Sequence, residues 1–172
     1  MKKVLFLFGI IAIITIGIVV GFKFFDPTKL KESNMTEDQK LTSSMGGPNK
    51  KIAMIIAFKG FRDEEYFVPR EIFEKAGMEV KTVSTEQGIA IGAGGGDTKV
   101  DLTIDDLNVE DFDAIIFVGG PGAYKYIDLE TAHRIAREAT EKNRLLAAIC
   151  IAPAILAKAG VLNQKEATVW SS

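Results

Sequence analysis

The segment around the single cysteine of this chain constrains the fold most strongly. An apolar run, residues 145–149, leads into Cys150, and a small, helix-prone run, residues 152–159, leads out of it. This order predicts a buried strand, a very tight turn and a helix. A side chain at such a turn is forced up out of the sheet, and the residues two positions away on either side must be small. Ala148 and Ala152 meet that requirement.

Cys150 has two interpretations at this stage. A thiol at the start of a helix lies near unpaired backbone N–H groups, which favour the reactive thiolate. A structural cysteine buried in the core is the alternative, because cysteine is among the most buried residue types. The single cysteine excludes a disulfide within the chain, and no cysteine and histidine residues have the spacing of a metal site. We therefore expect no metal ion, and no glycine motif predicts a nucleotide cofactor.

Hydropathy divides the chain into three parts. Residues 4–22 carry no charge, and as a helix they nearly span a hydrocarbon core of about 30 Å. We predict an uncleaved, single-pass membrane anchor over residues 1–25, with a cleaved signal peptide as the alternative. Lysines flank both ends of the span, and the short basic N-terminus favours an extracytoplasmic position for the rest of the chain. Residues 26–50 are predicted to be a polar linker, and residues 51–172 a single domain.

The order of elements in residues 51–172 predicts an α/β fold. Strands are expected at 51–58, 78–84, 114–118, 145–149 and 167–170, helices at 63–76, 128–143 and 152–159, and a small β excursion at 88–100. Pro69 is expected to kink the first helix or to separate its first turn. Alternating strands and helices predict a doubly wound parallel sheet with helices on both faces. Sites in such sheets lie beyond the carboxyl ends of the strands.

Acidic residues come directly after the first predicted strand at this end of the sheet. Asp63 and Glu64 suit a solvated helix start, where carboxylates are favourable. Glu65 is the candidate functional group, because an inward-pointing carboxyl would meet the sulfur of Cys150. Two like charges at close range repel, so we expect a protonated Glu65 that donates a hydrogen bond to a Cys150 thiolate.

The segment Gly-Gly-Pro-Gly at 119–122 has three interpretations. It is a simple turn, a phosphate cradle, or a loop that places the N–H of Gly120 opposite the N–H of Ile151 as an oxyanion hole. We favour the oxyanion hole if Cys150 is a nucleophile. His133, the single histidine, lies off the apolar stripe of its predicted helix. We expect it on the surface, so that a Cys–His dyad is not predicted.

Three stretches, residues 60–65 with Pro69, residues 112–122 and residues 147–153, together resemble the ThiJ/PfpI family. This flavodoxin-like group includes PfpI-type intracellular proteases and the parkinsonism-associated deglycase. The resemblance implies that Cys150 is the nucleophile, that Glu65 is its carboxyl partner and that Gly120 and Ile151 are the oxyanion donors. It also implies a homo-oligomer.

Two departures from the family pattern affect these expectations. PfpI-like proteases carry histidine directly after the cysteine, where this chain has Ile151. That difference argues against proteolysis. Family members also continue well past the position of Trp170, so final strands and a helix are expected to be missing from this sequence.

These observations favour an enzyme that acts on small reactive carbonyl compounds, as glyoxalase III and deglycase members do. Oxidation of Cys150 in a redox sensor or stress-protection protein is the first alternative. Peptidase-like or amidase-like hydrolysis and a membrane-tethered binding domain without catalysis are the others. A net charge of −2 without a basic stripe gives no reason to expect a nucleic acid partner.

Overall fold

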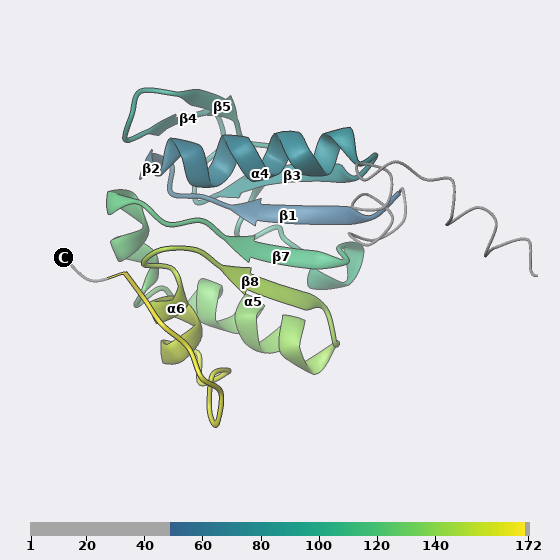
Figure 1. The fold of residues 1–172 in the computed structure, drawn as a ribbon, viewed down its shortest axis with the longest axis vertical. Coiled ribbons are helices and arrows are strands. Elements are labelled where there is room, and N and C mark those ends of the chain that lie inside the picture. Colours follow the sequence, from purple (N-terminus) through teal and green to yellow (C-terminus); the bar gives the residue numbers. More distant parts are fainter. Residues whose placement is uncertain (1–48, 171–172) are drawn as a thin grey trace, which may run out of the picture. The chain divides into compact units, whose positions relative to one another are not determined.

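A five-stranded parallel sheet organises the part of the chain that the computed structural model describes, residues 49–170 (Figure 1). In spatial order its strands are β6 (Leu102–Thr103), β3 (Glu79–Ser84), β1 (Lys51–Ile55), β7 (Ala114–Phe117) and β8 (Leu145–Ala148). Each neighbouring pair is parallel. The α/β fold with a parallel central sheet is therefore confirmed.

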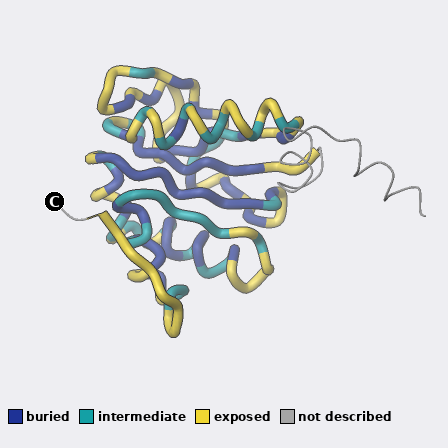
Figure 2. The backbone as a smooth tube through the Cα atoms, viewed as in Figure 1, coloured by how far each residue is buried: buried dark blue, intermediate teal, exposed yellow. Residues whose placement is uncertain are grey.

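The central strands are buried because both faces of the sheet are covered. All four residues of β7 and all but the first residue of β1 are buried, whereas β8 at the edge is only half-buried (Figure 2). Near-continuous apolar runs of this kind are typical of strands with helices on both faces. Leu145 at the start of β8 is 67% exposed. The sheet therefore has a well-covered centre and a more exposed edge at β8.

Helices connect the parallel strands. The chain runs from β1 through α4 (Asp63–Lys75) to β3, and from β7 through α5 (Glu130–Glu141) to β8. A short helix, α6 (Pro153–Lys158), follows β8. The two crossovers move in opposite directions along the sheet, and crossovers are right-handed as a rule. This rule places α4 and α5 on opposite faces.

A second, three-stranded sheet lies beside α4. Its strands are, in spatial order, β2 (Lys59–Phe61), β4 (Ile89–Gly92) and β5 (Asp97–Lys99). The hairpin of β4 and β5 is antiparallel and confirms the β excursion predicted at 88–100. Two short 3₁₀ helices, η1 (Val109–Asp111) and η2 (Pro121–Tyr126), complete the described elements. β2 matters for the site because it leads directly into α4.

Two local predictions differ from the structure. Helix α4 is continuous across Pro69, so no first turn is separated, and the alternative of a kink at Pro69 stays a prediction. The missing N–H of a proline removes one helical hydrogen bond, and the packed helix tolerates that loss here. Residues 167–170 form no strand; the backbone bond found there within the described residues runs from the Trp170 N–H to the Cys150 carbonyl, at 2.9 Å.

The predicted membrane anchor, residues 1–25, lies outside the described residues, as does almost all of the predicted linker at 26–50. Between residues 49 and 170, none of the helices has both the length and the apolar character needed to cross a bilayer.

Candidate active site

Cys150 lies two residues beyond the end of β8 and three residues before α6. Its backbone is left-handed, with φ of 60°, and its thiol is free and half-buried. This conformation is unfavourable by about 1–2 kcal/mol for a residue with a Cβ atom, and such strain is concentrated at functional sites. The tight strand-to-helix turn predicted around the cysteine is confirmed.

Glu65 lies in the first turn of α4, and its carboxyl group reaches the backbone of the loop after β7. The Gly119 N–H donates to Glu65 Oε2 at 3.0 Å. A Cβ atom added to Gly119 would lie 2.7 Å from that oxygen and 2.8 Å from Cys150 Cβ. The Glu65 carboxyl group and the Cys150 side chain therefore both lie against Gly119, and the absence of a side chain on this glycine leaves room for both. The structure brings these two predicted residues together; the hydrogen bond between carboxyl and sulfur stays a prediction.

Gly120 lets two loops approach each other backbone to backbone. Its φ of 101° lies in the region that favours glycine, and a Cβ atom there would lie 2.4 Å from Arg62 N. The Arg62 N–H in turn donates to the Gly119 carbonyl at 3.1 Å. The loops that follow β1 and β7 are thereby fixed against each other at the carboxyl ends of the strands.

A cavity of about 310 Å³ opens at Cys150, a volume suited to a small ligand. It is lined by Arg62, Gly120, Pro121, Tyr124, Cys150, Ile151 and Trp170. Within residues 49–170, neither the Gly120 N–H nor the Ile151 N–H donates to a protein acceptor. Both groups are thus available at the cavity, and their role as oxyanion donors stays a prediction.

Trp170 also lines this cavity, and the sequence alone did not predict this position. Its N–H donates to the Cys150 carbonyl, which holds the indole-bearing residue at the mouth of the site. The apolar run at 167–170 predicted a strand instead. The sequence alone could not show that a single backbone bond brings this residue to the cysteine.

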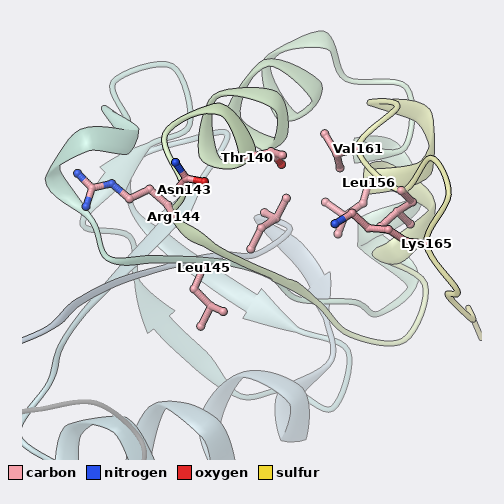
Figure 3. Close-up of a pocket in the computed structure, with 9 residues that line it drawn as sticks. Thr140, Asn143, Arg144, Leu145, Leu156, Val161 and Lys165 are labelled. Atoms are coloured by element: carbon pink, nitrogen blue, oxygen red, sulfur yellow. The ribbon is translucent and has the colours of Figure 1, made fainter.

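A larger cavity of about 490 Å³ lies elsewhere, beside the edge strand and between α5 and α6 (Figure 3). It is lined by Thr140, Asn143, Arg144, Leu145, Leu146, Leu156, Val161, Leu162 and Lys165. None of the predicted site residues lies in it. The smaller cavity is therefore the candidate active site, since it contains the thiol.

Asp63 is the first residue of α4, as predicted for a carboxylate at a helix start, and it also binds a neighbouring loop. Its carboxylate accepts hydrogen bonds from the Gly94 N–H at 2.6 Å and the Gly96 N–H at 2.7 Å. The bond from Gly94, followed by that from Gly96, holds the pKa of Asp63 below its ordinary value of 3.8. The glycine-rich loop between β4 and β5 is thereby tied to the first turn of α4, which also carries Glu65.

This carboxylate predicts a pH-dependent variant. A lowered pKa in the folded state contributes stability that is present above the unfolded value and is lost as pH falls through the folded value. Asp63→Asn is therefore expected to be less stable than the unmodified protein at neutral pH, with a difference that narrows below about pH 5. Urea unfolding from about pH 6 to pH 3 measures both curves. A difference that stays constant over this range would contradict the assignment.

His133 is buried, and the prediction of a surface residue is wrong. One ring nitrogen, Nε2, lies 2.7 Å from the Ile127 carbonyl oxygen, and Nδ1 lies 3.4 Å from Glu130 Oε2. This pairing satisfies the imidazole inside the fold, and His133 does not line the cavity at Cys150. In the described part of the chain, no group of three or more histidine, cysteine, aspartate or glutamate residues is arranged to hold a metal ion.

The fold and the site together define a class of α/β domain. In this class a cysteine with a strained backbone follows a strand of the central sheet and lies close to a glutamate from α4. The DJ-1/PfpI family matches residues 50–172, and the chain belongs to the DJ-1/PfpI family. The resemblance to ThiJ/PfpI proteins that the sequence motifs indicated is therefore confirmed.

Two curated relatives illustrate the similarity. The chain is 43% identical over 123 residues to an uncharacterized protein of Methanocaldococcus jannaschii, an overlap of 71% of this chain and 60% of that protein. It is 35% identical over 117 residues to the deglycase PfpI of Pyrococcus furiosus, an overlap of 68% of this chain and 70% of the relative. The chain thus matches 60% of the length of the Methanocaldococcus protein.

Two solved structures share the fold. A ThiJ/PfpI domain protein from Brachyspira murdochii superposes with a TM-score of 0.70 at 34% identity, covering 73% of this chain and 72% of that structure. Toxoplasma gondii DJ-1, solved in an oxidized form, gives a TM-score of 0.63 at 28% identity, covering 70% and 66%.

Proposed function

We propose that this chain is a cysteine-dependent enzyme that acts on small reactive carbonyl compounds. The observation that supports the proposal is the meeting of the Glu65 carboxyl and Cys150 at Gly119, beside a cavity of about 310 Å³. The similarity to a protein named as a deglycase points in the same direction.

The first step is addition of the Cys150 sulfur to an aldehyde carbon. A carbon–sulfur bond forms, the π electrons of the carbonyl move to its oxygen, and that oxygen takes the proton from Glu65 to give a hemithioacetal. The N–H groups of Gly120 and Ile151 stabilise the negative charge that develops on the oxygen. The carboxyl and the two N–H groups therefore act on the same atom at successive moments.

The second step moves a proton between the two carbons of a dicarbonyl such as glyoxal. The Glu65 carboxylate removes the proton from the sulfur-bearing carbon, and the neighbouring carbonyl takes up the electron pair as an enediolate. Glu65 returns this proton to the neighbouring carbon, and the hydroxyl proton of the sulfur-bearing carbon moves to the other oxygen, which gives a thioester. Water hydrolyses the thioester to release the thiol. Glyoxal and water become glycolate, with one carbon oxidised and the other reduced, so no external oxidant is needed.

The test is the conversion of glyoxal to glycolate by the purified full chain, followed by proton NMR. Glycolate is expected to accumulate in proportion to the amount of protein. A sample whose thiol has been blocked with iodoacetamide serves as the control and is expected to produce none above background. Absence of glycolate, or its formation at the same rate in the blocked sample, would refute the proposed activity.

Oxidation of Cys150 is a second candidate function. The thiol is free and half-buried, and no second cysteine is present to form a disulfide. The likeness to an oxidized DJ-1 of Toxoplasma gondii favours this chemistry. In hydrogen peroxide the sulfur attacks one oxygen, the O–O bond breaks, and sulfenic acid and water form; a second peroxide gives sulfinic acid. Mass spectrometry of the Cys150 peptide after peroxide treatment should show one or two added oxygen atoms, and an unmodified peptide would exclude this function.

We also propose that residues 1–25 anchor the chain in a membrane once, with the domain on the extracytoplasmic side, and that the chain forms a homo-oligomer. The uncharged run at 4–22 supports the anchor, and the family resemblance supports the oligomer. Extraction of membranes with alkaline carbonate tests the anchor, since an anchored chain stays in the pellet and a peripheral one is released.

A further inference from the structure

We propose that Arg62 forms an anion-binding subsite in the cavity, so that the substrate is a small dicarbonyl aldehyde that also carries a carboxylate group. This inference rests on the proposed function and specifies the substrate class of the same site. It starts from the charges around the cavity rather than from the reacting groups.

Arg62 is the single charged residue that lines the cavity in the described part of the chain. The other lining residues are glycine, proline, isoleucine, cysteine and two aromatic residues. The Glu65 carboxyl group reaches Gly119, the neighbour of the lining residue Gly120, and one of its oxygens accepts the Gly119 N–H. Arg62 is therefore the one basic residue on the wall that a ligand meets, and no acidic residue lies beside it in the lining.

Arg62 is an exposed residue, and it lines the cavity. Within residues 49–170, no carboxylate forms an ion pair with it. The carboxylate of the neighbouring residue Asp63 accepts hydrogen bonds from the Gly94 and Gly96 N–H groups, and the charge of Arg62 helps to lower its pKa. An arginine side chain binds a carboxylate through two parallel hydrogen bonds, a geometry that a lysine does not reproduce. Arg62 therefore has both the charge and the freedom to bind an anionic substrate group.

The backbone of Arg62 is fixed next to the predicted oxyanion donor. Its N–H donates to the Gly119 carbonyl, and a Cβ atom on Gly120 would lie 2.4 Å from Arg62 N. A ligand of a few atoms in a cavity of this volume can thus present an aldehyde to Cys150 and an anionic group to Arg62 at once. A neutral dicarbonyl would leave the guanidinium without a partner.

Charge selectivity at Cys150 tests the subsite without requiring turnover. Iodoacetate and iodoacetamide both alkylate the sulfur with loss of iodide and have nearly the same size, but only iodoacetate is an anion. Arg62→Gln is expected to slow alkylation by iodoacetate about five- to tenfold while changing the rate with iodoacetamide less than about twofold. Mass spectrometry of the Cys150 peptide follows both rates.

Four further measurements sharpen the result. Arg62→Lys keeps the charge and should retain part of the preference, and Arg134→Gln on α5, where Arg134 pairs with Glu138, should leave it unchanged. Raising the salt concentration should weaken the preference of the unmodified protein. Glyoxylate, which carries a carboxylate beside its aldehyde, should protect the thiol from iodoacetamide at a lower concentration than glyoxal does, and Arg62→Gln should remove this advantage.

The outcomes separate the two proposals. The anion subsite would be overturned if the ratio of the iodoacetate rate to the iodoacetamide rate were the same in Arg62→Gln and in the unmodified protein. This conclusion would hold regardless of the result of the glyoxal assay. Charge-selective alkylation together with absence of glycolate formation would support the subsite and refute the proposed activity on glyoxal.

Discussion

Cys150→Ser is expected to lower the conversion of glyoxal by at least about a thousandfold. A serine hydroxyl stays protonated at neutral pH, whereas a cysteine supplies the more nucleophilic thiolate. The remaining cavity still binds a carbonyl compound but forms no covalent adduct. Initial rates measured by proton NMR over a range of glyoxal concentrations give the ratio of kcat/KM values.

Glu65→Gln separates the role of the carboxyl from that of the sulfur. The amide keeps the size of the side chain and can still accept the Gly119 N–H, but it cannot take a proton from carbon. Conversion is expected to fall about 10²–10⁴-fold, the range for loss of a general base. Alkylation of Cys150 by iodoacetamide should continue in this variant. Full activity in Glu65→Gln would remove the carboxyl from the mechanism.

The left-handed backbone at Cys150 gives a control for folding. Cys150→Ala retains a Cβ atom at φ of 60°, whereas Cys150→Gly does not. The glycine variant should be more stable than the alanine variant by about 1 kcal/mol, although both should be inactive. Free energies of unfolding in urea give this difference. Equal stabilities would show that the turn is unstrained.

Gly122→Ala is expected to destabilise the domain by about 3 kcal/mol or more. A Cβ atom at this position would lie 2.0 Å from the Lys59 carbonyl oxygen and 2.6 Å from Ala57 Cβ. Ala57 lies in the loop after β1 and Lys59 is the first residue of β2, so relief of the overlap requires the segments after β1 and β7 to separate. The free energy of unfolding and the midpoint of thermal unfolding measure the loss.

Gly160→Ala is the matched control for this overlap. Gly160 has φ of 80°, and a Cβ atom there would meet nothing within 4 Å. Its substitution should therefore cost only the conformational preference, about 1 kcal/mol. If Gly122→Ala unfolds at the same urea concentration as Gly160→Ala, the close approach of the two loops is not a constraint on the fold.

Local patterns predicted the parts of the structure that depend on neighbours in sequence. The apolar runs of β1, β7 and β8 and the glycine-rich hairpin are recognisable because each element carries its own periodicity and turn residues. The turn at Cys150 is of this kind, since small residues on both sides of the cysteine permit it. Glu65 was predicted from its place at the end of the first strand.

The missed features each depend on a backbone group that folding brings from elsewhere. Asp63 binds N–H groups about thirty residues away, Trp170 binds the Cys150 carbonyl, and His133 is satisfied by the carbonyl of Ile127. Side-chain types in the sequence do not reveal which backbone groups are left for them. Arg62 was passed over for a similar reason, because its position in a run of charged residues suggested only a solvated helix start.

The position of Trp170 makes its intrinsic fluorescence a probe of the candidate active site. It is the single tryptophan of the chain, it lies at the wall shared with Cys150, and its residue is 51% exposed. The tryptophan fluorescence of the chain therefore originates beside the sulfur of Cys150. Ligand binding should quench this fluorescence or shift its emission maximum, so binding can be followed in real time without a label.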